Sequence, residues 1–301
     1  MQIDLNRFRG CLLGLAVGDA VGTTVEFQKR ASFPLVTDMV GGGPFHLKPG
    51  QWTDDTSMAL CLATSLVTKN GFDPIDQMDR YWDWYQNGYL SSTGECFDIG
   101  NTVRQALERY KHTGNPFSGA TTANAAGNGS LMRLAPIPMF YFPKLENIIN
   151  FAGESSRTTH GALECMEACQ LFAEILFRAL SGMSKDDILF NTSVKTVSPQ
   201  IKDIASGEYC KKSMTQIEGT GYVVKSLEAA LWCFYQTDTF ESAILQAANL
   251  GDDADTTAAI CGQVAGAYYG KSGIPTKWLE KLFMHAEISH LADKLSRIEH
   301  L

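Results

Sequence analysis

Apolar positions along the chain recur at helical intervals. In the clearest stripe, Cys165, Cys169, Phe172 and Leu176 are spaced i, i+4, i+7 and i+11, which places them on one face of a helix. Stripes of the same period occur at Met58/Leu62/Leu66, Val224/Leu227/Leu231/Phe234 and Cys261/Val264/Tyr268. Strand-like alternation over several residues is hard to find. The pattern therefore predicts an all-α protein built from many short helices.

The loop segments do not divide the chain. Residues 41–44 and 91–94 are rich in Gly, Ser, Thr and Pro, but each is too short to act as a linker between domains. A chain of 301 residues with 45% hydrophobic residues can bury one large core. We expect residues 1–301 to form a single domain.

Composition narrows the classes of partner. The formal net charge of −8 argues against general nucleic-acid binding, which needs a basic surface. No signal peptide is evident, and no apolar run is expected to be long enough to span a bilayer, so no membrane partner is expected. The eight cysteines are scattered without a CxxC pair, so a zinc site is not expected. A reducing, cytoplasmic setting is expected. No coiled-coil or interface signature is present, and a monomer is expected.

Two acidic clusters carry the candidate chemistry. They lie 200 residues apart and open two apolar segments with the shared pattern D-T-[S/T]-x-A-[L/I]-C. Helix capping would account for a single cluster. Adjacent carboxylates that are buried together raise each other's pKa unless a cation is present, and hard divalent cations prefer oxygen ligands. The proposed ligands of two Mg²⁺ or Mn²⁺ ions are Thr53, Asp54, Asp55, Asp253, Asp255 and Thr256. This hypothesis requires the two clusters to meet.

Two glycine-rich loops are candidate substrate-binding segments. The first consists of Gly127, Asn128, Gly129 and Ser130. Its backbone N–H groups could contact a phosphate, although most such runs are simple turns. In the second, Gly219 and Gly221 permit close backbone approach, and Tyr222 either stacks on a ring of the substrate or packs in the core.

Four further polar residues have two interpretations each. Asp98 and Asn101 precede a helical pattern and could cap that helix, or Asp98 could serve as an acid or base. Glu26 follows the first helical stretch as a loop acid or a site carboxylate. His160 is a single histidine, a residue that more often satisfies a buried polar group than binds a ligand.

Several motifs, taken in order, resemble the ADP-ribosylglycohydrolase family. They are GLAVGDA at 14–20, EF at 26–27, QWTDDT at 51–56, DIGNT at 98–102, GNGSLMR at 127–133 and GDDADT at 251–256. The resemblance runs from about Phe8 to about Leu282. By pattern it is nearest to the dinitrogenase reductase-activating glycohydrolases, the bacterial branch that is specific for arginine.

The resemblance implies a compact, orthogonal multi-helix fold with a dinuclear metal cleft. It implies two Mg²⁺ or Mn²⁺ ions and hydrolysis of the bond between ADP-ribose and an arginine of a modified protein, with ADP-ribose as product. Hydrolysis of another ADP-ribose conjugate (serine-linked, nucleic-acid-linked or small-molecule) and non-catalytic ADP-ribose binding remain open as alternatives.

The resemblance also implies roles for individual residues. Asp98, Glu26 and Asp55 are the catalytic candidates: Asp98 reaches the substrate ribose, and Glu26 positions water or guards the entrance. The implied substrate-binding set is Asn101, Gly127, Asn128, Gly129, Ser130, His160, Gly219, Gly221 and Tyr222, with the first glycine loop at the pyrophosphate. The chain departs from the family at Asp252, where much of the family has a second glycine.

Overall fold

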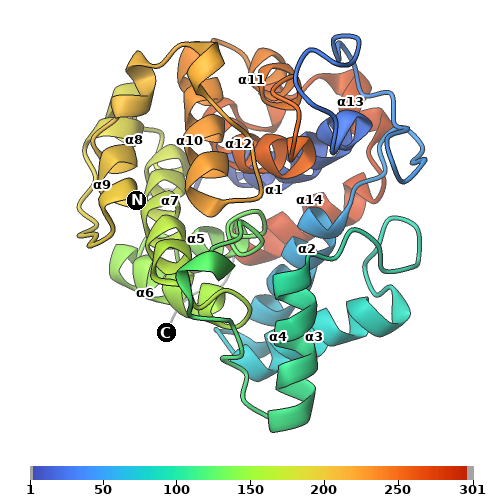
Figure 1. The fold of residues 1–301 in the computed structure, drawn as a ribbon, viewed down its shortest axis with the longest axis vertical. Coiled ribbons are helices and arrows are strands. Elements are labelled where there is room, and N and C mark those ends of the chain that lie inside the picture. The colour runs from blue at the N-terminus through green and yellow to red at the C-terminus, as the bar shows by residue number, and fades with distance from the viewer. Residues whose placement is uncertain (1–2, 297–301) are drawn as a thin grey trace.

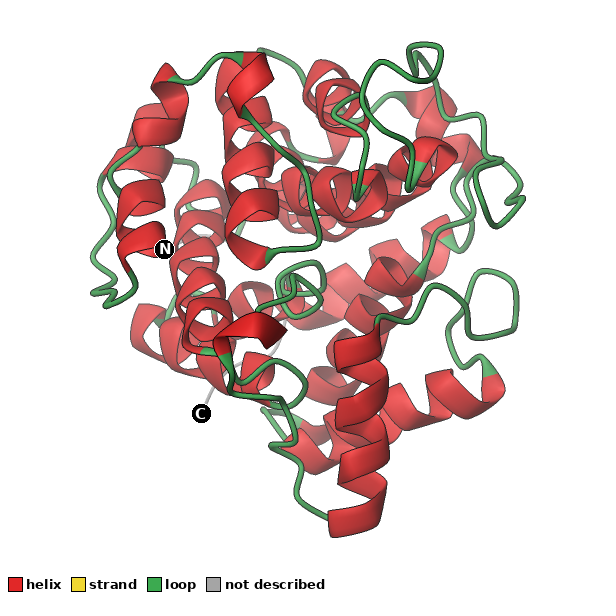
Figure 2. Cartoon of the chain, in the orientation of Figure 1, coloured by secondary structure: helices red, strands yellow, loops and turns green. Residues whose placement is uncertain are grey.

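The computed structural model describes residues 3–296, and the regular elements in that range are helices (Figure 1). Within these residues no β-strand is present, only three isolated bridges, and loops join the helices (Figure 2). The all-α prediction is therefore confirmed. The α-helices are α1 (Leu5–Gly22), α2 (Asp54–Lys69), α3 (Pro74–Asn87), α4 (Asn101–Thr113), α5 (Pro136–Tyr141), α6 (Leu145–Arg157), α7 (Leu163–Leu180), α8 (Lys185–Phe190), α9 (Pro199–Ala205), α10 (Val223–Gln236), α11 (Phe240–Ala248), α12 (Ala254–Tyr269), α13 (Thr276–Lys281) and α14 (His285–Ser296).

Helix α1 is the central element of the fold. From Phe8 to its end nearly every residue is buried, whichever side of the helix it occupies. A helix that is apolar on all sides must be surrounded by other elements. Helices α2, α7, α11, α12 and α14 all contact it, and α12 does so along its whole length (Figure 1).

Helices α1 and α12 touch backbone to backbone. Glycines spaced four residues apart form a stripe on α1, and a Cβ added at Gly14 would lie 2.2 Å from the carbonyl oxygen of Gly262. At Gly18 the same atom would lie 2.1 Å from the carbonyl oxygen of Ala258. The contacts run in opposite chain directions, so the end of α1 lies against the start of α12 at Gly22.

The two acidic segments begin two buried helices. Asp54 is the first residue of α2, and Asp253 immediately precedes α12. Both helices start inside the protein, with Asp55 and Asp255 buried. The shared sequence pattern thus marks two helix starts at the interior of the fold. The expectation of a single domain over residues 1–301 stays a prediction.

One expectation about apolar length is wrong. The segment Leu5–Val25 has a mean hydropathy of 1.2. By length and composition alone, this segment is long and apolar enough to span a membrane. In the structure 89% of that window is buried inside the protein. Its apolar character therefore matches the packing of α1 among its neighbouring helices.

The backbone contact makes a specific stability prediction. Gly14→Ala should lower the free energy of unfolding by about 2 kcal/mol or more, because its methyl group would overlap a backbone carbonyl that cannot rotate away. Chemical denaturation measures the change. Gly100→Ala is the matched control, since a Cβ there meets nothing within 4 Å and its φ of −65° suits any residue. Equal stability of the two variants would show that α1 and α12 are not in close contact.

Candidate active site

The two acidic clusters meet in the interior, as the metal hypothesis requires. The Thr53 Oγ1 lies 3.3 Å from the Oδ2 of Asp55 and 3.3 Å from the Oδ2 of Asp255. The Thr256 Oγ1 lies 3.4 Å from the Oδ2 of Asp55. Side chains from the starts of α2 and α12 therefore share one buried, oxygen-lined space.

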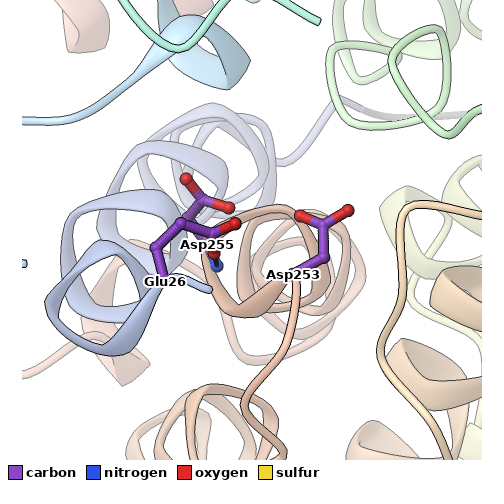
Figure 3. A group of neighbouring side chains, drawn as sticks. All are labelled: Glu26, Asp253 and Asp255. Atoms are coloured by element: carbon purple, nitrogen blue, oxygen red, sulfur yellow. Dashed lines mark hydrogen bonds between the residues drawn. The ribbon is translucent and has the colours of Figure 1, made fainter. Parts of the chain in front are cut away.

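Glu26 joins this space from the end of α1. One carboxylate oxygen each of Glu26, Asp253 and Asp255 lie within 4.8 Å of one another. Figure 3 shows Glu26 coming from the segment after α1 and the two aspartates from the start of α12. The Oε2 of Glu26 accepts hydrogen bonds from the N–H groups of Ala254 (2.7 Å) and Asp255 (3.2 Å). Glu26 thus caps α12 from another helix.

Asp19 caps the start of α2 in the same way, a role that was not predicted from the sequence. Its Oδ1 accepts hydrogen bonds from the N–H and Oγ1 of Thr53, both at 2.9 Å. Its Oδ2 accepts from the N–H (3.0 Å) and Oγ1 (2.6 Å) of Thr56. The available signal was a charged residue inside an otherwise apolar stretch, since an aspartate is seldom buried without partners.

The capping interpretation of the acidic clusters is therefore wrong. Thr53 and Asp253 occupy the N-cap positions of α2 and α12, and neither side chain bonds to its own helix as a cap. The caps are Asp19 and Glu26, both contributed by the α1 segment. Within the clusters, Asp255 Oδ1 accepts the N–H of Thr256 (2.6 Å), whereas the Oδ1 of Asp55 has no hydrogen-bond partner.

Burial and mutual repulsion raise the pKa values of these carboxyl groups. Burial, reinforced by neighbouring charges, raises the pKa of Asp54 and Asp55 well above 3.8, and that of Asp255 to about 7. Burial followed by the charges of Asp255 and Asp253 raises the pKa of Glu26 in the same direction. Without a counter-charge the cluster must hold protons.

The cluster fits a divalent cation. The Oδ1 of Asp55 is buried with no hydrogen-bond partner, so this carboxylate oxygen receives no hydrogen bond from the protein. The other available donors are carboxylate and hydroxyl oxygens, the set that hard divalent ions prefer. Among the cleft-lining residues there is no Lys or Arg that could supply the positive charge instead. The acidic cluster could therefore hold a metal.

A cleft of about 480 Å³ opens over the cluster. Most of the predicted site residues line it: Glu26, Asp54, Asp98, Asn101, Gly127, Asn128, Gly129, His160, Gly221, Asp253, Asp255 and Thr256. Thr53 and Asp55 are not among the lining residues; they are buried and reach the cluster through the hydroxyl contacts above. Phe27, Ile99, Gly100, Thr102, Val103 and Met132 also line the cleft and were not predicted.

The first glycine loop forms one wall and is tied to the acidic cluster. The Nδ2 of Asn128 donates to the Oδ2 of Asp253 (2.8 Å), and its backbone N–H donates to the carbonyl of Gly221 (3.1 Å). Among the hydrogen bonds of residues 3–296, none uses the backbone N–H of Gly129 or Ser130. Of these two residues Gly129 lines the cleft, so its N–H is available to a ligand there.

His160 supports this loop as a neutral ring. A Cβ at Gly129 would lie 2.8 Å from the Cε1 of His160, so the loop packs directly on the imidazole. Burial lowers the pKa of His160 to about 3, and its Nδ1 is 2.9 Å from the Oγ1 of Thr159. The imidazole therefore carries no positive charge at neutral pH and could offer a ligand only hydrogen bonding.

Asp98 is aimed at the cleft and does not cap a helix. Helix α4 begins at Asn101 with Gly100 at its N-cap and no side-chain cap, so the capping interpretation of Asp98 and Asn101 is wrong. Burial, followed by the charges of Asp255 and Asp54, raises the pKa of Asp98 to about 11. Asn101 is exposed, and its Oδ1 accepts a hydrogen bond from Arg104 (2.6 Å).

Three predicted substrate-binding residues do not line the cleft. The hydroxyl of Tyr222 donates to the Oε2 of Glu164 at 2.8 Å. The carbonyl of Gly219 accepts the N–H of Asp253 at 2.9 Å, and the Oγ of Ser130 accepts a hydrogen bond from Ser156. Their assignment to substrate stays a prediction.

Asp252 also has a structural explanation. It is exposed and has a left-handed backbone with a φ of 58°. This conformation favours glycine, and Asp and Asn tolerate it better than most other residues. The departure from the family pattern thus replaces one turn-compatible residue with another.

Comparison with known proteins is consistent with this geometry. A family model described as ADP-ribosylglycohydrolase matches residues 1–300. The chain is 46% identical to ADP-ribosylarginine hydrolase Tri1 of Serratia proteamaculans, over 97% of this chain and 79% of that protein. It is 33% identical to the ADP-ribosyl-[dinitrogen reductase] glycohydrolase of Rhodospirillum rubrum, covering 94% and 92% of the two chains. A solved structure titled ADP-ribosylglycohydrolase-related protein complex superposes with a TM-score of 0.87 at 43% identity, covering 98% of this chain and 99% of that one.

The raised pKa values predict how stability depends on pH and metal. A carboxyl group with a raised pKa stabilises the fold while it is protonated. That contribution is complete below about pH 4 and is lost as the pH rises through about 6 for Asp19 and about 7 for Asp255. Metal-free protein should therefore lose stability between pH 4 and pH 7.

A bound cation should offset this loss. The rise in unfolding temperature caused by Mn²⁺ should be larger at pH 7.5 than at pH 5 by at least about 2 °C, measured by thermal unfolding with and without chelator. KCl at equal ionic strength controls for screening. An equal Mn²⁺ effect at both pH values would contradict the assignment of these carboxylates.

Proposed function

The chain belongs to the ADP-ribosylglycohydrolase family, and we propose on this premise that it hydrolyses the N-glycosidic bond between ADP-ribose and an arginine of a modified protein. The observation that carries the proposal is one cleft containing both the acidic cluster and the first glycine loop. The cluster suits a ribose and a water molecule. The loop, with the unpaired N–H of Gly129 in the cleft, suits a diphosphate.

Two divalent ions, Mg²⁺ or Mn²⁺, are the proposed cofactors. Their ligands would come from Asp54, Asp55, Asp253, Asp255 and Thr256, with Thr53 beside them. When bound, the ions neutralise the carboxylates, lower the pKa of water and polarise the sugar hydroxyls. Glu26 is fixed by its two bonds to the start of α12, which holds its carboxylate where it could orient the attacking water.

The hydrolysis needs a proton at the leaving nitrogen. An O–C1′ bond forms to water, which gives up one proton, while the C1′–N bond breaks and the guanidine nitrogen receives one proton. Asp98 is suited to supply it, because it lines the cleft and its burial raises the pKa of its carboxyl group. The unmodified arginine and free ADP-ribose are the products.

The proposed setting is a reducing compartment such as the cytoplasm. All eight cysteines are free, and six of them are buried. Free buried thiols are typical of proteins that are not stabilised by disulfides.

Adjacent aspartates offer a matched pair of variants. Asp253→Asn should lower kcat/KM for release of ADP-ribose from an arginine conjugate by roughly 100-fold, because it removes a cluster charge with almost no change in shape. Asp252→Asn should leave the rate near the wild-type value, because Asp252 is exposed and asparagine accepts its left-handed backbone. A wild-type rate in Asp253→Asn would refute the role of the cluster.

The linkage is tested with defined conjugates. Purified protein is assayed on arginine-linked and serine-linked ADP-ribose with Mn²⁺, Mg²⁺ or chelator. Release from the arginine conjugate that requires a divalent ion supports the proposal. Release from the serine conjugate alone would reassign the linkage. Binding of ADP-ribose without turnover would indicate a non-catalytic protein.

A further inference from the structure

Three phenylalanine rings form an aromatic rim, of which Phe27 lines the cleft. Phe27 and Phe45 have ring centroids 6.2 Å apart in an edge contact, and Phe45 and Phe97 lie 5.2 Å apart. They come from three separate segments: the end of the α1 region, the loop at 41–50, and the approach to α4. Phe27 lines the cleft and is 67% exposed, so its ring offers an open apolar face.

The exposure of Phe27 is maintained by its backbone. Its φ is 62°, a left-handed conformation that costs a bulky residue about 1 kcal/mol or more. The N–H of Phe27 donates to the carbonyl of Asp252 (2.8 Å), and the N–H of Asp252 donates to the carbonyl of Gln28 (2.7 Å). This pair of bonds fixes the strained residue beside the start of α12 while Glu26, its neighbour, is buried.

Two rings of the rim adjoin, in sequence, two of the three candidate catalytic carboxylates. Phe27 directly follows Glu26, and Phe97 directly precedes Asp98. The first glycine loop is attached instead to Asp253, through Asn128. Glu26, Phe27 and the first glycine loop all line the same cleft.

The direction of the substrate follows from the chemistry of ribose. In this ribose the diphosphate is carried on C4′ through C5′ and the leaving group is on C1′, and these two ring carbons flank the ring oxygen. With the diphosphate on the glycine loop and C1′ at the acidic cluster, the group on C1′ would lie in the part of the cleft that Glu26 and Phe27 line. This step rests on the proposed function.

Charge favours a guanidinium as the occupant. Among the cation–ring contacts of residues 3–296, none involves Phe27, Phe45 or Phe97, so no Lys or Arg of this part of the chain stacks on these rings. The nearby Glu26 and Asp98 are acidic, and a planar guanidinium stacks on an aromatic face better than an ammonium does. A serine linkage has no cation to place there.

We propose that Phe27, backed by Phe45 and Phe97, is a specificity-determining residue that stacks on the guanidinium of the modified arginine. The contact exists before and during bond cleavage, so it contributes to binding of the conjugate. It is absent once ADP-ribose alone occupies the cleft.

The test compares Phe27→Leu with Phe27→Tyr in steady-state kinetics on ADP-ribosylarginine. Leucine keeps the apolar volume and the need for a left-handed backbone but removes the ring. We expect it to raise KM three- to fivefold with kcat within twofold, while the inhibition constant of ADP-ribose stays unchanged. Tyrosine should restore the wild-type KM. Phe190→Leu is the control, because Phe190 is also partly exposed and in edge contact with a ring (Tyr235, 5.8 Å) but does not line the cleft.

The outcomes separate this inference from the proposed function. If wild-type protein does not act on ADP-ribosylarginine, the proposed function fails. If wild-type protein is active and Phe27→Leu has a wild-type KM, the stacking role is refuted. A parallel loss of ADP-ribose affinity in Phe27→Leu would also refute it, because the residue would then shape the whole cleft.

Discussion

The backbone contact between α1 and α12 is the constraint on which the rest of the structure depends. Glycines at four-residue spacing let the two helices approach until carbonyl oxygens lie where a Cβ would be. Because the helices run antiparallel, the end of α1 is fixed against the start of α12. Glu26 therefore reaches the first N–H groups of α12, while Asp19, two turns earlier, holds the start of α2. Two helix starts and their carboxylates are positioned by one helix.

This arrangement concentrates like charges. Two unit charges 4 Å apart repel by about 4 kcal/mol at an effective dielectric constant of 20. A helix N-terminus stabilises a nearby carboxylate by about 0.3–1 kcal/mol, and by at most about 2 kcal/mol when partly buried. The helix starts alone cannot offset several buried carboxylates. The remaining compensation must come from protons or from bound cations, which is why the raised pKa values and the unpartnered oxygen of Asp55 point to a cation site.

Much of this could be predicted from sequence because it is local. The periodic apolar stripe at Cys165 and Phe172 lies on α7, and the repeated D-T pattern lies at the starts of α2 and α12. The role of Asp19 could not be predicted, since it caps a helix that begins 35 residues later and no local spacing encodes that contact. Tyr222 was equally undecidable, because its orientation depends on a hydrogen bond to Glu164 on α7. The left-handed residues Phe27 and Asp252 are held together by bonds between distant segments, from Phe27 N–H to Asp252 and from Asp252 N–H to Gln28, which local sequence does not encode.

The central claim is that buried carboxylates, forced together by helix packing, exchange protons for divalent cations. Calorimetric titration of metal-free protein with Mn²⁺ at pH 6.5, repeated in two buffers of different ionisation enthalpy, measures the protons released on binding. The account predicts saturable Mn²⁺ binding with net proton release. In Asp255→Asn this proton-releasing binding should disappear. Absence of Mn²⁺ binding, or binding without proton release, would contradict it.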